Sequence, residues 1–181
     1  WVSRVPGLVF GFEEALGYLT HPSVVRDKDG ISAAADALAM VCELVARGRT
    51  VWDLLDEASE RFGHFASTQV VMRLASPAAV AAVAERIRRE PPTEFSGIAV
   101  ERIRDFQQPG LSAVPANVLA YDLADGSRVM IRPSGTEPKL KSYLDVRCTE
   151  GSVTARRESA AATLAALETG VRSVLDAAAS A

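Results

Sequence analysis

Apolar residues recur at helical spacing in the first third of the chain. Between residues 31 and 47 they stand three or four positions apart, which predicts a helix ending at Gly48. These positions are Leu38, Val41, Cys42 and Val45. Thr50 and Asp53 then form a pair typical of a capping box, which predicts a second helix that stops at Gly63. Before both helices, residues 7–12 read as a short buried strand running into a polar loop.

Strand patterns dominate the second half of the chain. Ser76 and Pro77 predict the start of a helix that reaches about Glu90, where two prolines end it. Strand-like segments follow at residues 98–106, 118–123, 128–132 and 139–148, with a hairpin turn at residues 124–127. An Ala-rich helix, roughly residues 153–178, closes the chain.

The order of these elements changes character near residues 64–75. We therefore expect one part from residue 1 to 66 and a second from residue 67 to 181. The first part reads as an α/β fragment and looks incomplete, because one strand with two helices cannot form a stable sheet layer. The second part is expected to be an α+β domain: an antiparallel four-stranded sheet flanked by helices that cover one face.

Charge and composition exclude several classes of protein. The 181 residues have a net charge of −3, which gives no overall basic field for binding nucleic acid, so any anion site must be local. No apolar stretch is long enough to cross a bilayer, so no membrane partner is expected. Cys42 and Cys148 lack metal-like spacing, and we expect a reducing cytoplasm. The start at Trp1, without a methionine, suggests that upstream sequence is missing.

Residues 130–148 contain the strongest candidate for chemistry. From Lys139 onward apolar and polar residues alternate strictly, so Lys139 and Lys141 project from one face of a strand. Before them, the turn at residues 134–136 offers two hydroxyls and backbone N–H groups that glycine allows to converge. Arg132 adds a planar fork suited to two phosphate oxygens. The alternative is a polar hairpin with solvated lysines, but the whole combination favours a cradle for a dianion.

Three motifs in this chain resemble the α-D-phosphohexomutases, the phosphoglucomutase and phosphomannomutase superfamily. The motif "RPSGTEPKLKSY" at residues 132–143 looks like the phosphate-binding loop of that family's last domain. The motif "GFEEALGY" at residues 11–18 resembles its sugar-binding loop, and "VRDKDGISAA" at residues 25–34 resembles the segment after it. The form of the sugar-binding loop resembles the branch that contains phosphopentomutases and related hexose-phosphate mutases.

The resemblance implies a four-domain parent enzyme with a phosphoserine that exchanges phosphate with the sugar. It also implies Mg²⁺, held by an aspartate-rich loop, and a hexose bisphosphate as activator. In this chain it assigns the grip on the substrate's non-reacting phosphate to residues of the last domain. These residues are Arg132, Ser134, Gly135 and Thr136, with Lys139 and Lys141 as supporting charge.

The resemblance also assigns a sugar-binding role to Glu13, a carboxylate that can accept hydrogen bonds from two vicinal hydroxyls. Glu14 could share this role. Many relatives carry a serine where this chain has Ala15, so one expected hydrogen bond to the sugar is in doubt. Lys28 matches a family lysine that reaches the substrate, and its alternative is an exposed turn lysine near a helix start.

No catalytic nucleophile and no metal loop are recognised in this sequence. The "DKD" at residues 27–29 is too short for the family's metal loop, and His21 and His64 lie in no catalytic constellation. We therefore expect the C-terminal part of a mutase that interconverts hexose 1-phosphate and 6-phosphate, inactive by itself without its N-terminal domains. The alternatives are a phosphopentomutase of the same superfamily and a stand-alone module that binds phosphosugars without chemistry.

Overall fold

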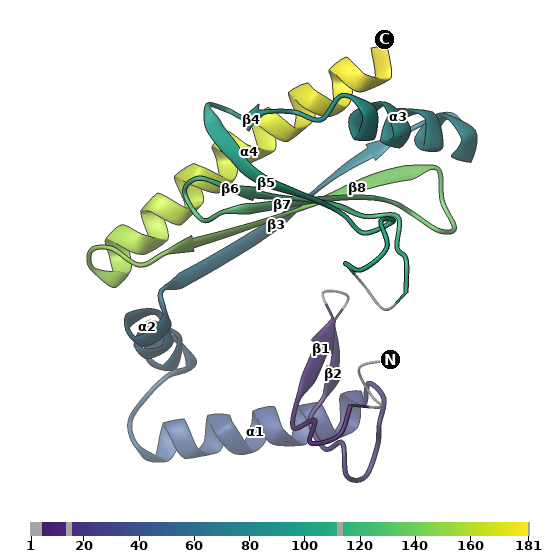
Figure 1. The fold of residues 1–181 in the computed structure, drawn as a ribbon. Helices are drawn as coiled ribbons and strands as arrows, with labels where there is room; N and C mark the ends of the chain where they lie inside the picture. The colour runs from purple at the N-terminus through teal and green to yellow at the C-terminus, as the bar shows by residue number, and fades with distance from the viewer. Residues whose placement is uncertain (1–4, 14–15, 112–113, 181) are drawn as a thin grey trace. The chain divides into compact units, whose positions relative to one another are not determined.

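The computed structural model describes residues 5–13, 16–111 and 114–180. The chain divides into two compact units, residues 1–57 and residues 58–181, and this division falls within helix α2 (Val51–Phe62). Each unit is built around its own elements (Figure 1). No helix in the described ranges combines the length and apolar content needed to cross a bilayer.

The first unit contains a small hairpin and a long helix. Strands β1 (Gly11–Glu13) and β2 (Gly17–Leu19) pair antiparallel, with Glu13 opposite Gly17. Helix α1 (Gly30–Ala46) begins at Asp29, whose carboxylate accepts hydrogen bonds from the N–H groups of Ile31 and Ser32. The predicted stop at Gly48 is confirmed by its left-handed φ of 67°.

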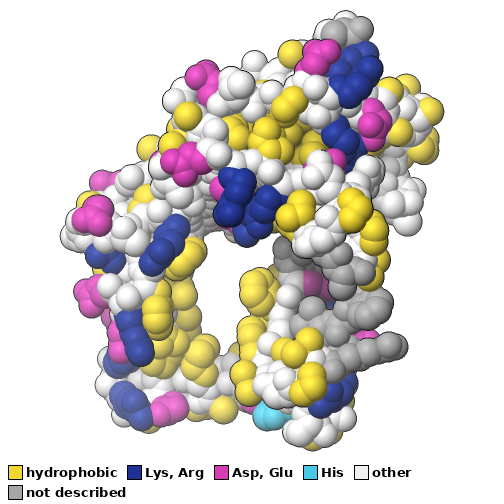
Figure 2. All heavy atoms as spheres, in the orientation of Figure 1, with side chains coloured by type: hydrophobic (Ala, Val, Ile, Leu, Met, Phe, Trp, Pro, Cys, Tyr) yellow, Lys and Arg dark blue, Asp and Glu magenta, His cyan; other side chains and the backbone are white. Residues whose placement is uncertain are grey.

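The expectation of a buried strand at residues 7–12 was wrong. The strand begins only at Gly11, and Val9, Phe10 and Phe12 are 80%, 51% and 73% exposed. Among the described hydrophobic residues of this unit, only Leu19 and Leu44 are buried. Apolar side chains instead lie at the surface over α1 and α2, as Figure 2 shows. This unit therefore lacks a core of its own among the residues described.

Helix α2 begins and ends as its sequence predicts. The Thr50 N–H donates to the Asp53 carboxylate over 2.7 Å, and the Asp53 N–H donates to the Thr50 hydroxyl over 3.2 Å, a reciprocal capping box. Gly63 follows the helix with a φ of 93°, and a Cβ there would lie 3.0 Å from the Cys148 carbonyl oxygen. Glycine is therefore required where the chain turns from α2 into the sheet of the second unit.

The second unit is built on an antiparallel sheet with six strands rather than the four predicted. Their order is β3-β8-β7-β6-β5-β4. The four predicted strands are present as β5 (Ile98–Asp105), β6 (Leu119–Leu123), β7 (Arg128–Pro133) and β8 (Lys139–Cys148). Two more strands flank them: β3 (His64–Arg73), which pairs with β8 along its whole length, and β4 (Glu94–Phe95), which pairs with β5. The predicted division between residues 66 and 67 falls inside β3.

Two helices cover one face of this sheet. Helix α3 (Pro77–Arg89) begins at Ser76, whose hydroxyl accepts a hydrogen bond from the Ala79 N–H, and helix α4 (Val153–Ser180) runs across the strands (Figure 1). Together with the inward side chains of the strands they form the core. Among the described residues of this unit, no helix lies against the other face of the sheet. Polar and charged side chains project from that face, which we call the open face.

Candidate functional site

Strand β8 presents its charged side chains on the open face, as its alternation predicts. Leu140, Leu144 and Val146 are at most 3% exposed and point into the core. The alternate residues, from Lys139 to Arg147, lie on the open face. The predicted register of this strand is confirmed, so Lys139 and Lys141 share one side of the sheet.

The turn between β7 and β8 leaves part of its backbone free. The Ser134 N–H donates to the Lys139 carbonyl over 2.8 Å, so this donor is used within the turn. No described atom accepts a hydrogen bond from the N–H of Gly135 or Thr136. Gly135 does not have a positive φ, so the converging nest expected from a left-handed glycine is not formed in this structure. A Cβ on Gly135 would meet nothing within 4 Å, which leaves that side of the turn open to a ligand.

Two cations stand beside this turn without a carboxylate partner. Arg132 on β7 is paired in register with Lys141 on β8, so both project from the open face at the same level. Within the part of the chain that the structure describes, neither forms an ion pair. The Arg132 guanidinium lies 5.9 Å from the centre of the Tyr143 ring, a cation–π contact that leaves its N–H groups available. The structure thus brings together Arg132, Lys141 and the turn.

Lys139 was expected to add free positive charge beside the turn, but its ammonium forms an ion pair. It pairs with Glu137 of the same turn, and its side chain is only 14% exposed. The hydrogen bond from Lys139 lowers the pKa of the Glu137 carboxyl, and the positive charges of Lys139, Arg73 and Lys141 act in the same direction. An exposed carboxylate under this influence indicates a locally positive potential at the turn.

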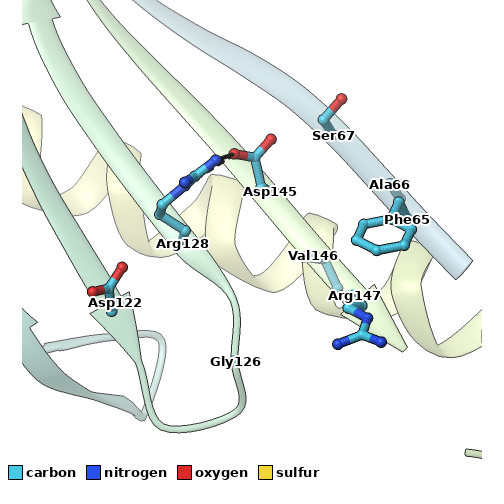
Figure 3. A pocket seen from close by; sticks show the side chains of 9 residues that line it. All are labelled: Phe65, Ala66, Ser67, Asp122, Gly126, Arg128, Asp145, Val146 and Arg147. Atoms are coloured by element: carbon cyan, nitrogen blue, oxygen red, sulfur yellow. Dashed lines mark hydrogen bonds and ion pairs between the residues drawn. The ribbon is translucent and has the colours of Figure 1, made fainter. Parts of the chain in front are cut away.

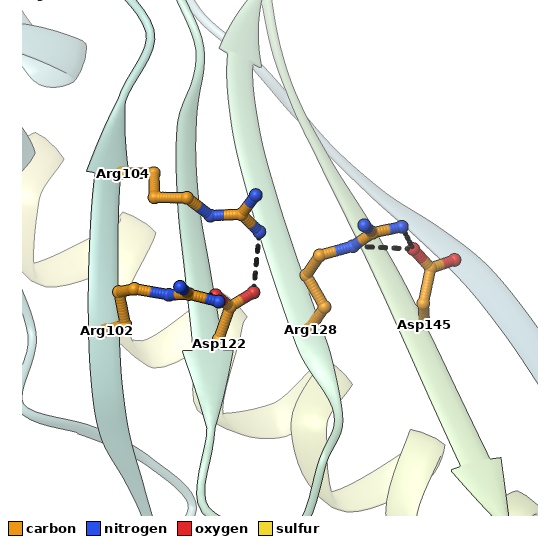
Figure 4. A network of polar contacts seen from close by, with 5 residues as sticks. All are labelled: Arg102, Arg104, Asp122, Arg128 and Asp145. Carbon is orange, nitrogen blue, oxygen red and sulfur yellow. Dashed lines mark hydrogen bonds and ion pairs between the residues drawn. The ribbon is translucent and has the colours of Figure 1, made fainter. Parts of the chain in front are cut away.

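Three other arginines of the open face are neutralised by aspartates. Arg102 and Arg104 both donate to the Asp122 carboxylate, over 2.8 and 2.7 Å (Figure 4). Burial would raise the pKa of Asp122, but these two hydrogen bonds outweigh it and lower the pKa. Arg128 donates to Asp145 with two of its nitrogens. Among the described residues, these three arginines are thus neutralised, whereas Arg132 and Lys141 beside the turn are not.

A shallow cavity of about 430 Å³ lies at the opposite end of the open face. Figure 3 shows Arg128 and Asp145 joined across it, with Phe65 and Arg147 at its other side. The Arg147 guanidinium lies 5.4 Å from the Phe65 ring centre and donates to the Phe62 carbonyl. Its positive and negative side chains are thus already bound to protein groups. This cavity therefore has fewer free hydrogen-bond donors for an anion than the turn has.

The predicted sugar-binding residues Glu13 and Lys28 meet in the first unit. The Lys28 ammonium lies 3.1 Å from the Glu13 carboxylate, and this hydrogen bond and charge raise the pKa of Lys28. The Asp29 N–H donates to the Tyr18 carbonyl over 2.9 Å and fastens the Lys28 segment to the hairpin. Both side chains are about half exposed. Glu14 and Ala15 lie outside the described residues.

Sequence reasoning missed Arg73, the last residue of β3. It is exposed and stands opposite Lys139 in the register of β3 and β8. The alternation of apolar and polar residues in β3 could have placed Arg73 on the open face. That alternation is weak because the apolar Phe65 and Val71 also lie on the open face.

The acidic residues near Lys28 serve the backbone. Asp27 accepts a hydrogen bond from the Lys28 N–H over 2.7 Å, and Asp29 caps α1. Both carboxylates are therefore engaged by backbone N–H groups. Across the described ranges, no three His, Cys, Asp or Glu side chains gather as metal ligands would.

Comparisons with known proteins show which family the chain resembles. Residues 71–163 match the family model described as the phosphoglucomutase/phosphomannomutase C-terminal domain. A probable phosphomannomutase of Haemophilus influenzae is 39% identical over 97% of this chain and 34% of its own length. A phosphoglucomutase of Staphylococcus epidermidis is 30% identical over 86% of this chain and 31% of its own.

The fold agrees as well. The open form of parafusin, a phosphoglucomutase from Paramecium, superposes with a TM-score of 0.58 at 17% identity, over 88% of this chain and 30% of that one. The chain thus spans about a third of the length of these relatives. On this evidence the chain belongs to the phosphoglucomutase/phosphomannomutase family and corresponds to the C-terminal part of its members.

Proposed function

We propose that this chain is the substrate-recognition part of a phosphosugar mutase that interconverts hexose 1-phosphate and 6-phosphate. The observation that carries the proposal is the pair of unneutralised cations, Arg132 and Lys141, beside a turn with free N–H groups. The phosphoserine and the Mg²⁺ loop of such an enzyme would lie in the longer protein, outside these residues. We therefore expect the chain by itself to show no turnover in a coupled mutase assay with Mg²⁺ and a hexose bisphosphate.

In this proposal the turn holds the phosphate that does not react. Arg132 presents two parallel N–H donors to phosphate oxygens, and the Gly135 and Thr136 N–H groups with the Ser134 and Thr136 hydroxyls add further donors. Lys141 contributes positive charge. Lys139 contributes positive charge as well once its ammonium separates from the Glu137 carboxylate. Phosphoryl transfer depends largely on positioning and charge neutralisation, so a clamp on the distant phosphate orients the sugar for the step.

Such a clamp must work in two orientations. The idle phosphate sits at opposite ends of the sugar in the two half-reactions, so its binding site has to recognise phosphate and ignore the carbon that bears it. The donors near the turn fit this demand because charge and N–H or O–H groups address only phosphate oxygens. A bisphosphate activator would offer either of its phosphates to the same groups.

Glu13 and Lys28 are proposed to bind the sugar itself. A carboxylate accepts hydrogen bonds from two vicinal hydroxyls and so senses ring stereochemistry. The ion pair with Lys28 holds the Glu13 carboxylate in place and keeps a donor beside it. Together the two side chains offer an acceptor and a donor to neighbouring sugar oxygens.

Titration calorimetry on the 181-residue chain tests the proposal. Glucose 1-phosphate and glucose 6-phosphate are expected to bind weakly and with similar affinity, while glucose does not bind detectably. Arg132→Lys is expected to weaken phosphate binding by roughly 1.5–3 kcal/mol, because the charge remains but the two-pronged geometry is lost. Equal binding of glucose and its phosphates, or an Arg132→Lys variant with unchanged affinity, would contradict the proposal.

A further inference from the structure

Strand β3 ends directly beside the phosphate-binding turn. Its last residue, Arg73, is the register partner of Lys139, so the two side chains leave the sheet on the same face. The next residue, Leu74, donates its N–H to the Pro138 carbonyl over 3.0 Å. The end of β3 is therefore fastened to the turn, although residues 73 and 134 are far apart in sequence.

Four cations then lie on three neighbouring strands. Arg73 comes from β3, Lys139 and Lys141 come from β8, and Arg132 comes from β7, with β8 in the middle. Two strand spacings and an offset of two residues along β8 place the Cα atoms of Arg73 and Arg132 about 12 Å apart. Two extended arginine side chains can bridge that distance, so both guanidinium groups can reach one anion between them.

Arg73 has no carboxylate partner among the described residues. Three arginines farther from the turn do have one: Arg102 and Arg104 share Asp122, and Arg128 pairs with Asp145. Glu137, the acidic residue closest to Arg73 in the turn, is already paired with Lys139. Glu137 attracts Arg73 as well, but one carboxylate among four cations leaves a net positive charge that a bound anion would offset.

We propose that Arg73 is a further phosphate-binding residue, which grips the substrate phosphate from β3 on the side opposite Arg132. This inference rests on the proposed function, because it adds a second arginine to the same phosphate site. The inference extends the site beyond the turn motif to the last residue of strand β3. The phosphate is then held between two forks, with the Lys141 ammonium beside it.

Phosphate titrations followed by NMR at the Gly135 and Thr136 amides test this role. The probes are inorganic phosphate and glucose 6-phosphate, added to the 181-residue chain and to four variants, at Arg73 (two), Arg128 and Arg132. Arg73→Gln is expected to weaken binding of both probes by roughly three- to tenfold and to reduce the dependence of binding on salt. Arg73→Lys keeps the charge and is expected to lose less. Unchanged denaturant unfolding of the Arg73 variants checks that the sheet is intact.

Arg128→Gln is the matched control, because Arg128 lies on the same face but is paired with Asp145. Four residues along β7 place it about 13 Å from Arg132, beyond the screening length of physiological salt, so binding should not change. If Arg73→Gln binds both probes as tightly as the unaltered chain while Arg132→Lys binds weakly, the inference about Arg73 is wrong and the proposed function stands. If the unaltered chain binds neither probe, both fail.

Discussion

The arginines of the open face differ in what they are bound to, and this difference locates the site better than their positions in the sequence. Arg102, Arg104 and Arg128 are neutralised by aspartates on neighbouring strands. Arg132 contacts an aromatic ring instead, which leaves its donors for a ligand. A sequence shows that arginines are present, but the pairing across strands that neutralises some of them depends on the register of the sheet.

Gly17 leaves room for the ion pair of Glu13 and Lys28, the proposed sugar-binding residues. A Cβ on this residue would lie 2.3 Å from Lys28 Cδ and 2.7 Å from the Glu13 carboxylate oxygen. Gly17→Ala is therefore expected to separate the Lys28 ammonium from Glu13. Because Glu13 raises the pKa of Lys28, the variant should show a lower Lys28 pKa in an NMR titration of its side chain.

The sign of this effect follows from the ion pair. A raised lysine pKa means that the contact is fully present at neutral pH and is lost as pH rises through that pKa. Gly30→Ala serves as the control, since a Cβ there would meet nothing within 4 Å. An identical Lys28 pKa in the Gly17→Ala variant and the unaltered chain would contradict this prediction. It would mean that the ion pair of Glu13 and Lys28 does not depend on the missing side chain at Gly17.

At the scale of elements, strand β8 divides its residues between the core and the site. Leu144 is fully buried, and truncating it leaves a cavity, so Leu144→Ala is expected to cost about 2–5 kcal/mol of unfolding free energy. Lys141→Ala removes an exposed ammonium and should cost little. Denaturant unfolding of both variants measures this contrast, and the opposite ranking would mean that the strand has the other register.

Elements with a local signal could be predicted from the sequence. The capping pair Thr50 and Asp53, the Ser76 cap and the alternation of β8 each specify their structure within a few residues. Strand β3 was missed because its buried side has polar Thr68 while its open side carries Phe65, so alternation is weak. Its identity as a strand depends on pairing with β8, which is distant in the chain.

The candidate site shows the same limit. The turn motif identified Arg132 and Lys141 correctly as neighbours, since both flank one hairpin. The motif could not show that Glu137 forms an ion pair with Lys139, because that contact depends on how the turn folds back on itself. Arg73 comes from an element whose partner strand lies more than sixty residues away in the chain, and the local alternation that points to it is weak.

At the scale of the whole molecule, the two units differ in how much apolar surface they bury. The second unit has an extensive core between the sheet and helices α3 and α4, whereas the described part of the first buries only Leu19 and Leu44. Burial of apolar surface is the main force that offsets the conformational entropy lost on folding. The units should therefore differ in their ability to fold separately.

A piece containing residues 50–181 is expected to unfold cooperatively in denaturant, because it keeps the core and the capped start of α2. In that piece Arg156 can still donate to the Ser59 carbonyl and fasten α2 to α4. A piece containing residues 1–49 should show no cooperative transition by circular dichroism. A sharp, cooperative unfolding transition in residues 1–49 would contradict this account of the first unit.

We propose above all that the turn end of the open face binds the phosphate of a sugar phosphate. Backbone chemical-shift mapping of the 181-residue chain with glucose 6-phosphate tests it most directly, with glucose as the reference. The predicted shifts centre on Arg132, Gly135, Thr136 and Lys141 and are absent with glucose. Shifts centred instead on the cavity near Gly126, Arg128 and Arg147, or equal shifts with glucose, would contradict the claim.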